Sequence, residues 1–213
     1  MKMVSCVINI FKVKLKRILM VSVNSVLTYM GIAAAVLAWV VIAVSISLNP
    51  WFSMFGNALS DLGNPHANYY WVYNYGLVVT AALMLLFSFH LLLVSENKVE
   101  VMGSSFVTIA SIFLALIGIF HEGTYPHTFV SEWFFTQMDL AVVVWSIGLV
   151  LSRRLNYGIP LLLLGLIAPV PALLIKWPST ALLETYGIVI IDIWAIVATI
   201  LIKGKAPRVH CGV

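Results

Sequence analysis

Charged residues are scarce in this chain. Asp, Glu, Lys and Arg make up only 9% of its 213 residues, whereas a soluble domain carries about 25% charged residues. So few charges cannot cover the surface of a water-exposed globule. Hydrophobic residues make up 62% of the chain. The apolar stretches reach the roughly 20 residues that a helix needs to cross a hydrocarbon core, so an integral membrane protein is predicted.

Cysteine and the common enzyme motifs are also rare or absent. The two cysteines, Cys6 and Cys211, lie near opposite termini, and both are expected on the cytoplasmic side, where a structural disulfide is unfavourable. The sequence has no Cys-x-x-Cys pair, Gly-x-Ser-x-Gly elbow, P-loop or dinucleotide fingerprint, so no cofactor-binding motif is assigned. The net charge of +4 comes from bases at helix ends, and nucleic acid is therefore not expected as a partner.

Six apolar runs are present, and each predicts a transmembrane helix because lipid offers no hydrogen-bond partner to an open backbone. They cover residues 26–48, 71–94, 101–120, 133–152, 157–175 and 182–202. The predicted fold class is all-α: a polytopic membrane helix bundle with six transmembrane helices. The chain divides into a basic N-terminal segment at 1–25, a transmembrane domain at 26–202 and a basic tail at 203–213.

The basic residues gather at one end of the predicted bundle: Lys2, Lys12, Lys14, Lys16, Arg17, Lys98, Arg153, Arg154, Lys203, Lys205 and Arg208. The positive-inside rule predicts that this end, with both termini, is cytoplasmic in a multi-pass protein of the plasma membrane. Lys176 is expected at the outer end, where it could pair with Glu184 or reach headgroup phosphate. The run after Arg17 is too long for a signal-peptide core and is interpreted as a retained helix, with residues 1–19 left open as part of the native start.

Most acidic residues and histidines are predicted at the outer end, in or near three connections: Asp61, His66, His121, Glu122, His127, Glu132, Asp139, Glu184 and Asp192. The first outer connection, residues 49–70, is also rich in aromatic residues, as is typical of a belt at the headgroup level. Residues 51–59 within it are interpreted as a short helix lying in the interface.

Two polar motifs are candidates for a site. In Ser60-Asp61-Leu62-Gly63-Asn64-Pro65-His66, which predicts a turn, Asp61 serves either as a cap that accepts backbone amide hydrogen bonds or as a catalytic group. In His121-Glu122-Gly123-Thr124-Tyr125-Pro126-His127, the residues are expected on a loop or an unwound helix end. His121 and His127, with Asp61, are candidate metal ligands, because imidazole and carboxylate suit zinc. Acid–base work and a simple hydrogen-bonded loop are the alternatives.

Two carboxylates are expected inside the membrane, Asp139 about two turns into the fourth helix and Asp192 at a similar depth in the sixth. Intramembrane carboxylates are costly and usually face the bundle interior or a wet cavity. Both therefore join Asp61, His121 and His127 as candidate catalytic residues. The alternative is that each carboxylate only fixes packing, through a hydrogen bond to a Thr, Tyr, Trp or His of a neighbouring helix.

Two further features bear on the function. Ala168-Pro169-Val170-Pro171 predicts a kink in the fifth helix, which either shapes packing or frees carbonyl groups that bind ions in a transporter. His90 has no second histidine at its depth, so a haem is not expected, and His90 is interpreted as a packed or hydrogen-bonded side chain.

The motif Ser60-Asp61-Leu62-Gly63, followed by Pro65 and by Tyr73-Asn74-Tyr75-Gly76-Leu77, resembles the first-loop signature of an uncharacterised prokaryotic six-helix membrane family, domain of unknown function 998. More distantly it resembles the Frag1/DRAM/Sfk1 membrane proteins, which carry a histidine before helix four, as His127 does here. A proline pair in those relatives is reduced to Pro65. The resemblance covers residues 27 to 202 and implies a six-helix bundle with a lipid-related role, but it assigns no catalytic residue.

Three functions agree with these features. The first is a lipid-associated membrane protein that handles or senses lipid at the extracytoplasmic face. The second is a membrane-embedded, metal-assisted lipid hydrolase or transferase, and the third is a proton-coupled small-solute transporter that uses Asp139 and Asp192. Membrane lipid is the predicted partner, and a homo-oligomer, the cofactor and the substrate are left open by the sequence.

Overall fold

The computed structural model describes residues 25–205, and the elements in that range are all helices. They are α2 (Met30–Leu48), η1 (Leu59–Gly63), α3 (Tyr70–Val94), α4 (Lys98–Ile119), α5 (His127–Leu151), α6 (Leu155–Ile167), α7 (Pro169–Leu174) and α8 (Thr180–Ile202). Since α6 and α7 follow one another as one span, the described residues contain six helices long and apolar enough to cross a membrane. The predicted all-α, six-helix class is confirmed. Sequence predictions that concern Lys2 to Arg17, Arg208 and the two cysteines lie outside the described residues.

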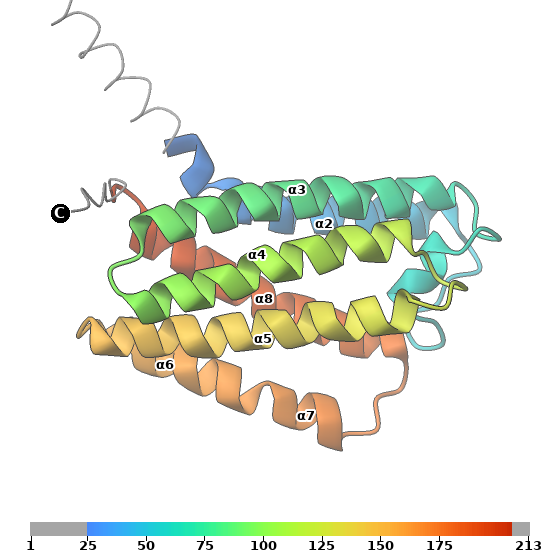
Figure 1. Ribbon diagram of the computed structural model, residues 1–213. Coiled ribbons are helices and arrows are strands. Elements are labelled where there is room, and N and C mark those ends of the chain that lie inside the picture. The colour runs from blue at the N-terminus through green and yellow to red at the C-terminus, as the bar shows by residue number, and fades with distance from the viewer. Residues whose placement is uncertain (1–24, 206–213) are drawn as a thin grey trace, which may run out of the picture.

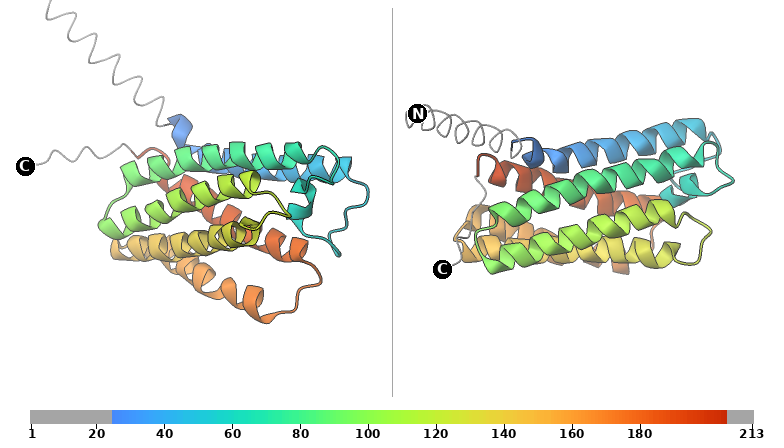
Figure 2. Two further views of the ribbon diagram at one scale, coloured as in Figure 1. Left: turned by 45° about the vertical axis from the view of Figure 1, so that its right-hand side comes forward. Right: turned by 45° about the horizontal axis from the view of Figure 1, so that its top comes forward.

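The six spans lie side by side along one direction, as Figure 1 shows. Helices that follow one another from α2 to α6 pack extensively against each other: α2 on α3, α3 on α4, α4 on α5 and α5 on α6. In Figure 1, α8 lies behind α4 and α5, and its contacts with α2 and α5 are less extensive. Both views in Figure 2 place η1 and the α4–α5 loop together at one end of the bundle. This end is called the η1 end here, and the opposite end, where the described chain begins and finishes, the terminal end.

Glycines permit the closest helix contacts. A Cβ atom on Gly103 of α4 would lie 2.6 Å from the backbone nitrogen of Trp145 in α5. A Cβ atom on Gly148 would lie 2.8 Å from the backbone nitrogen of Glu100, across the same pair of helices. Small residues at such positions let helix backbones approach in lipid, where van der Waals packing and hydrogen bonds replace the hydrophobic driving force.

A polar network joins α4 to α5 at the terminal end. Asn97 caps α4 by accepting from the amides of Val99 and Glu100 at 2.9 Å, and its Nδ2 donates to Ser152 Oγ at 2.8 Å. Glu100 is only 1% exposed, and it accepts from Ser152 Oγ at 3.0 Å. The buried carboxylate is therefore satisfied by neighbouring hydroxyl, amide and backbone groups, as a buried polar group requires.

Glu96 extends this network to the two neighbouring connections. Its carboxylate pairs with Arg154, which follows α5, and with Lys205 Nζ at 2.8 Å, beyond α8. Two of the eight acidic residues, Glu96 and Glu100, thus lie among the bases at the terminal end. The acidic residues are not confined to the opposite end, and here they hold the loops together.

Several expected boundaries are corrected. α5 begins at His127 rather than near residue 133, so His127 is the first residue of a helix and not part of a loop. The segment 51–59 is not an interfacial helix, because residues 51–58 form turns and a bend, and the short helix of this connection is the 3-10 helix η1, which begins at Leu59. The kink at Pro169 is confirmed, since α6 ends at Ile167 and α7 begins at Pro169. The hydroxyl of Tyr186 donates to the Ala168 carbonyl at this break, at 3.0 Å.

His90 is fully buried, and its Nε2 lies 3.0 Å from Thr28 Oγ1. The hydrogen-bonded interpretation of this histidine is confirmed.

Candidate functional site

The motif around Asp61 forms η1. Asp61 lies at the third position of this helix, and its Oδ2 accepts from the backbone N–H of Ala58 at 2.9 Å and from Asn57 Nδ2 at 3.2 Å. A carboxylate at this position accepts from an amide that has no partner within the helix. Its negative charge also interacts favourably with the positive end of the helix dipole. The capping role of Asp61 is confirmed.

The first connection is attached to the start of α8. Glu184 Oε2 accepts from the backbone N–H of Leu59 at 2.6 Å, and the Ala181 amide donates to the Asn57 carbonyl at 2.9 Å. Ser179, which caps α8, also donates from its hydroxyl to the Met54 carbonyl at 2.5 Å. These contacts join parts of the chain about 125 residues apart and fix η1 over the end of the bundle.

The glycine and asparagine of the family-like motif contact one another. Asn74 Nδ2 donates to the Gly63 carbonyl at 2.9 Å. A Cβ atom on Gly63 would lie 2.3 Å from Asn74 Oδ1. The chain therefore needs a residue without a side chain at 63 so that η1 can end against α3.

A second polar cluster surrounds Glu122. Its Oε2 accepts from Ser60 Oγ at 3.3 Å and lies 3.1 Å from His127 Nε2. The other ring nitrogen of His127, Nδ1, lies 2.7 Å from the Phe120 carbonyl, and His127 is 5% exposed. Both nitrogens of this histidine thus face groups of the α4–α5 loop, and Ser60 connects that loop to η1.

The structure brings together only some of the residues predicted for a site. Asp61 and His127 lie on two segments that Ser60 and Glu122 connect. The Nδ1 of His121 contacts the Glu122 carbonyl at 2.9 Å, and its ring lies 6.5 Å from that of Tyr70. Within residues 25–205, no three His, Cys, Asp or Glu side chains are grouped so that they could hold a metal ion. The proposed ligands His121, His127 and Asp61 therefore do not form a ligand set.

The two intramembrane carboxylates, Asp139 on α5 and Asp192 on α8, each lie roughly 18 Å along their helix from its first residue. Trp39 Nε1 of α2 donates to Asp192 Oδ2 at 2.7 Å. Asp139 is half-buried on α5 and makes no hydrogen bond or ion pair with the other residues of the 25–205 range. Lys176 is exposed and does not pair with Glu184, whose carboxylate is bonded to Leu59 instead.

A cavity of about 100 Å³ extends from the η1 end into the bundle. At the η1 end it is bounded by Leu59, Ser60 and Glu184, and at its far end by Gly31 and Trp194. Its walls come from α2, α3, α4, α5 and α8 and are mostly apolar, with the polar exceptions Ser60, Tyr73, Thr80, Ser131, Glu184 and Asp192. The less extensive packing of α8 against α2 and α5 leaves this space.

Sequence reasoning missed Glu184 and Ser60 as members of the site. Ser60 belongs to the motif around Asp61, and Glu184 is one of the acidic residues predicted near the outer end, but their partners lie 62 and 125 residues away. The excess of acidic residues near the outer connections is the sequence feature that could have indicated Glu184 as a member of the site.

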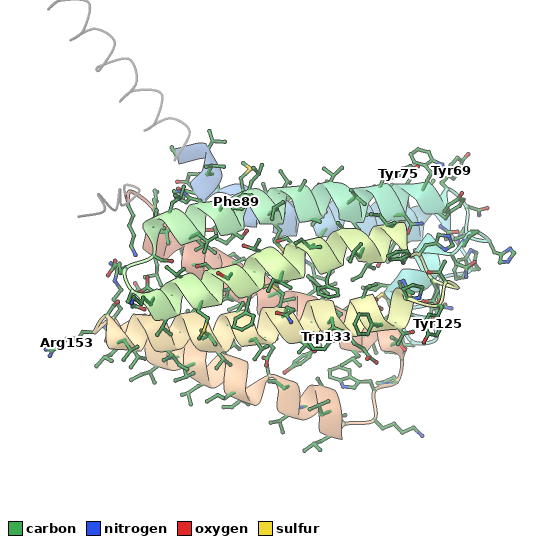
Figure 3. All side chains as sticks on the ribbon, in the orientation of Figure 1. Tyr69, Tyr75, Phe89, Tyr125, Trp133 and Arg153 are labelled. Atoms are coloured by element: carbon green, nitrogen blue, oxygen red, sulfur yellow. The ribbon has the colours of Figure 1, made fainter. Side chains whose placement is uncertain are left out.

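Exposed aromatic side chains surround the η1 end. Tyr69 is 60% exposed, Trp71 52%, Tyr75 68% and Tyr125 100%. Figure 3 shows Tyr69, Tyr75 and Tyr125 at this end and Arg153 at the other. Aromatic side chains with one polar edge are enriched at membrane–water interfaces.

Six apolar spans and a loop-covered end containing a polar network define a multi-pass integral membrane protein. Within that class, the chain belongs to the family described as protein of unknown function (DUF998), which matches residues 32–201. No curated protein and no solved structure matches it.

Proposed function

We propose that this protein binds membrane lipid in the cavity and handles or senses it at the extracytoplasmic face. The observation that carries the proposal is the cavity itself, which combines apolar walls with a polar mouth formed by Ser60 and Glu184. Ligand sites commonly combine apolar walls with a few polar groups that orient the ligand. The head group and first carbons of an amphiphile match that distribution, and because the cavity is only about 100 Å³ the rest of the chain would lie outside it, in the bilayer.

We place the route of entry between α2 and α8, which pack less extensively than α2 and α3. On the α2 side, Ala35 and Ala38 line the cavity and are only half-buried; on the α8 side, Ile188 and Ile191 have the same character. Small residues on α2 leave room for an acyl chain to enter sideways from the bilayer. The exposed aromatic residues near the mouth support a position of the η1 end at the headgroup level.

The proposal includes an orientation in the plasma membrane with the η1 end outside. Lys98, Arg153, Arg154, Lys203 and Lys205 lie at or next to the terminal end, and basic residues favour the cytoplasmic side. Both chain termini are then cytoplasmic.

The orientation predicts a labelling pattern. In a chain whose Cys6 and Cys211 are replaced by serine, Lys176→Cys is expected to react with a membrane-impermeant maleimide in intact cells, because residue 176 is exposed near the η1 end. Lys98→Cys, exposed at the terminal end, is the matched control and should react only after permeabilisation. The reverse pattern would show that the η1 end faces the cytoplasm.

The lipid site predicts that filling the cavity displaces its occupant. Ala38→Phe places a ring in the space between α2 and α8. Lipid that co-purifies with the protein in mild detergent should fall about tenfold, which corresponds to about 1.4 kcal/mol of binding free energy. Lipid extraction and mass spectrometry of the purified protein measure this ratio.

The matched control is Val36→Phe, which adds a ring to the same helix at a position 57% exposed and outside the cavity. It should retain wild-type lipid. Equal lipid content in wild type, Ala38→Phe and Val36→Phe would contradict binding in the cavity.

A metal-assisted hydrolase receives less support from the geometry. Both ring nitrogens of His127 are engaged by Glu122 and Phe120, and Asp61 is occupied by η1 amides. These side chains therefore hold η1 and the α4–α5 loop in place, and the geometry supports lipid binding better than catalysis.

A further inference from the structure

The cavity is lined by two carboxylates and by no base. Among residues 25–205, Glu184 and Asp192 are its charged lining residues. Glu184 lies at the mouth, and Asp192 lies eight residues further along α8, roughly 12 Å deeper at 1.5 Å per residue. The described ion pairs involve Glu122 and Glu96 only. Neither cavity carboxylate therefore has a cationic partner in the described protein.

Asp192 has one hydrogen bond, from the indole N–H of Trp39. A carboxylate inside a membrane normally pairs with a cation, with backbone groups or with a wet cavity. One neutral donor leaves most of its acceptor capacity free, since an ionised carboxylate offers about four acceptor sites. A cation from outside the chain would supply the partner that this carboxylate lacks.

A second, independent observation points to a ligand at the same level. Trp194 lines the cavity and is 1% exposed, and its Nε1 makes no hydrogen bond within residues 25–205. It follows Asp192 by two residues, so the two side chains leave α8 on different sides and line different walls of the cavity. Buried indole N–H groups normally find an acceptor. A ligand oxygen in the cavity is such an acceptor.

Aromatic rings surround this level as well. The ring of Trp194 lies 6.3 Å from that of Phe87, which also lines the cavity, and Trp39 contacts Asp192 directly. Aromatic faces attract ammonium groups through the ring quadrupole, more strongly when the site is desolvated. Carboxylate, indole donor and aromatic rings together favour an organic cation over an inorganic one.

We propose that the cavity selects a long-chain amine that also carries an oxygen acceptor. The ammonium pairs with Asp192, the oxygen accepts from Trp194 on another wall of the cavity, and the apolar chain lies along α2 and passes Ala38. The proposal rests on the lipid-binding function above and names the ligand class for that same cavity. An amino alcohol and an aminophospholipid share this chemistry.

The test uses the full-length protein in phosphatidylcholine nanodiscs and two photoreactive probes. One is a long-chain 2-amino-1,3-diol with a diazirine in its chain, and the other is the matched diol without the amine. The amine probe is expected to label the wild-type protein about tenfold more, as the loss of one charged hydrogen-bonded pair implies. Asp192→Asn should reduce its labelling to that of the amine-free probe.

Asp139→Asn is the matched control, because Asp139 is also a half-buried carboxylate in a membrane-spanning helix but does not line the cavity. It should leave the labelling ratio unchanged. If Asp192→Asn does not fold, the probe ratio on the wild-type protein decides the proposal alone.

Unlabelled competitors identify the source of the amine. Displacement of the amine probe by phosphatidylethanolamine supports a bilayer lipid as ligand, and displacement only by the free amino diol supports a single-chain amine. Equal labelling by both probes, reduced for both by Ala38→Phe, overturns the selection for an amine but leaves lipid binding standing. If neither probe labels the protein, both the selection for an amine and lipid binding in the cavity are overturned.

Discussion

Replacing Gly103 by valine is expected to lower the free energy of unfolding by about 3 kcal/mol, the upper part of the range for overpacked cores. The physical reason is that any side chain at this position meets backbone atoms of Trp145, the nearest at 2.6 Å from the first added carbon. Backbone cannot move aside as a flexible side chain can, so α4 and α5 must separate. Thermal unfolding in detergent should show a midpoint lowered by about 10 °C.

The adjacent Met102 provides the control for this change. It lies in the same helix, is 49% exposed, and Met102→Val introduces the same β-branched residue without a contact across α4 and α5. Its unfolding midpoint should stay close to that of the wild type. If both variants lose equal stability, the cause is the helix propensity of valine and not the close approach of the helices.

Replacing Glu184 by alanine is expected to release η1 from α8. The change leaves the amide of Leu59, which is 1% exposed, without its acceptor inside the protein. An unsatisfied buried donor costs about 1–3 kcal/mol, so protection of this amide from hydrogen exchange should fall about tenfold or more. Peptides covering residues 57–63, followed by mass spectrometry, report the change.

Two variants separate this role from a general effect of charge. Glu184→Gln keeps a carbonyl oxygen that accepts from Leu59 and should retain most of the protection. Glu132→Ala removes an exposed carboxylate of α5 and should leave exchange in η1 unaltered. Unchanged exchange in Glu184→Ala would show that Ser179 and Ala181 hold the loop without help from the carboxylate.

The number and type of helices could be predicted from composition because lipid imposes one requirement on every residue it touches. Backbone amides and carbonyls must pair within the segment, so a run of about 20 apolar residues crosses the membrane as a helix. Helix ends are less constrained, since the interface offers water and side chains as alternatives. The α5 helix therefore extends to His127 although Glu132 and His127 are polar.

The candidate site was only partly predictable. Asp61 could be recognised as a cap, because the donors to its carboxylate lie three and four residues away in the sequence. Ser60, Glu122 and His127 could be recognised as polar residues near loops, but not as one cluster. Asp192 could be recognised as costly, yet nothing local to α8 identifies Trp39 as its donor, 153 residues away.

The sequence alone determined that this protein crosses a membrane six times, that its bases gather at the terminal end and that acidic and aromatic residues mark the other. These properties depend on transfer free energies and local hydrogen bonds, which each segment carries within itself. Only the tertiary structure decided that Glu184 holds η1 and that Glu96 and Glu100 link the neighbouring connections at the terminal end. It also decided that a cavity lined by two carboxylates lies beside α8. Those features depend on which helices are neighbours and how closely they approach, and this is set by side chains far apart in the chain.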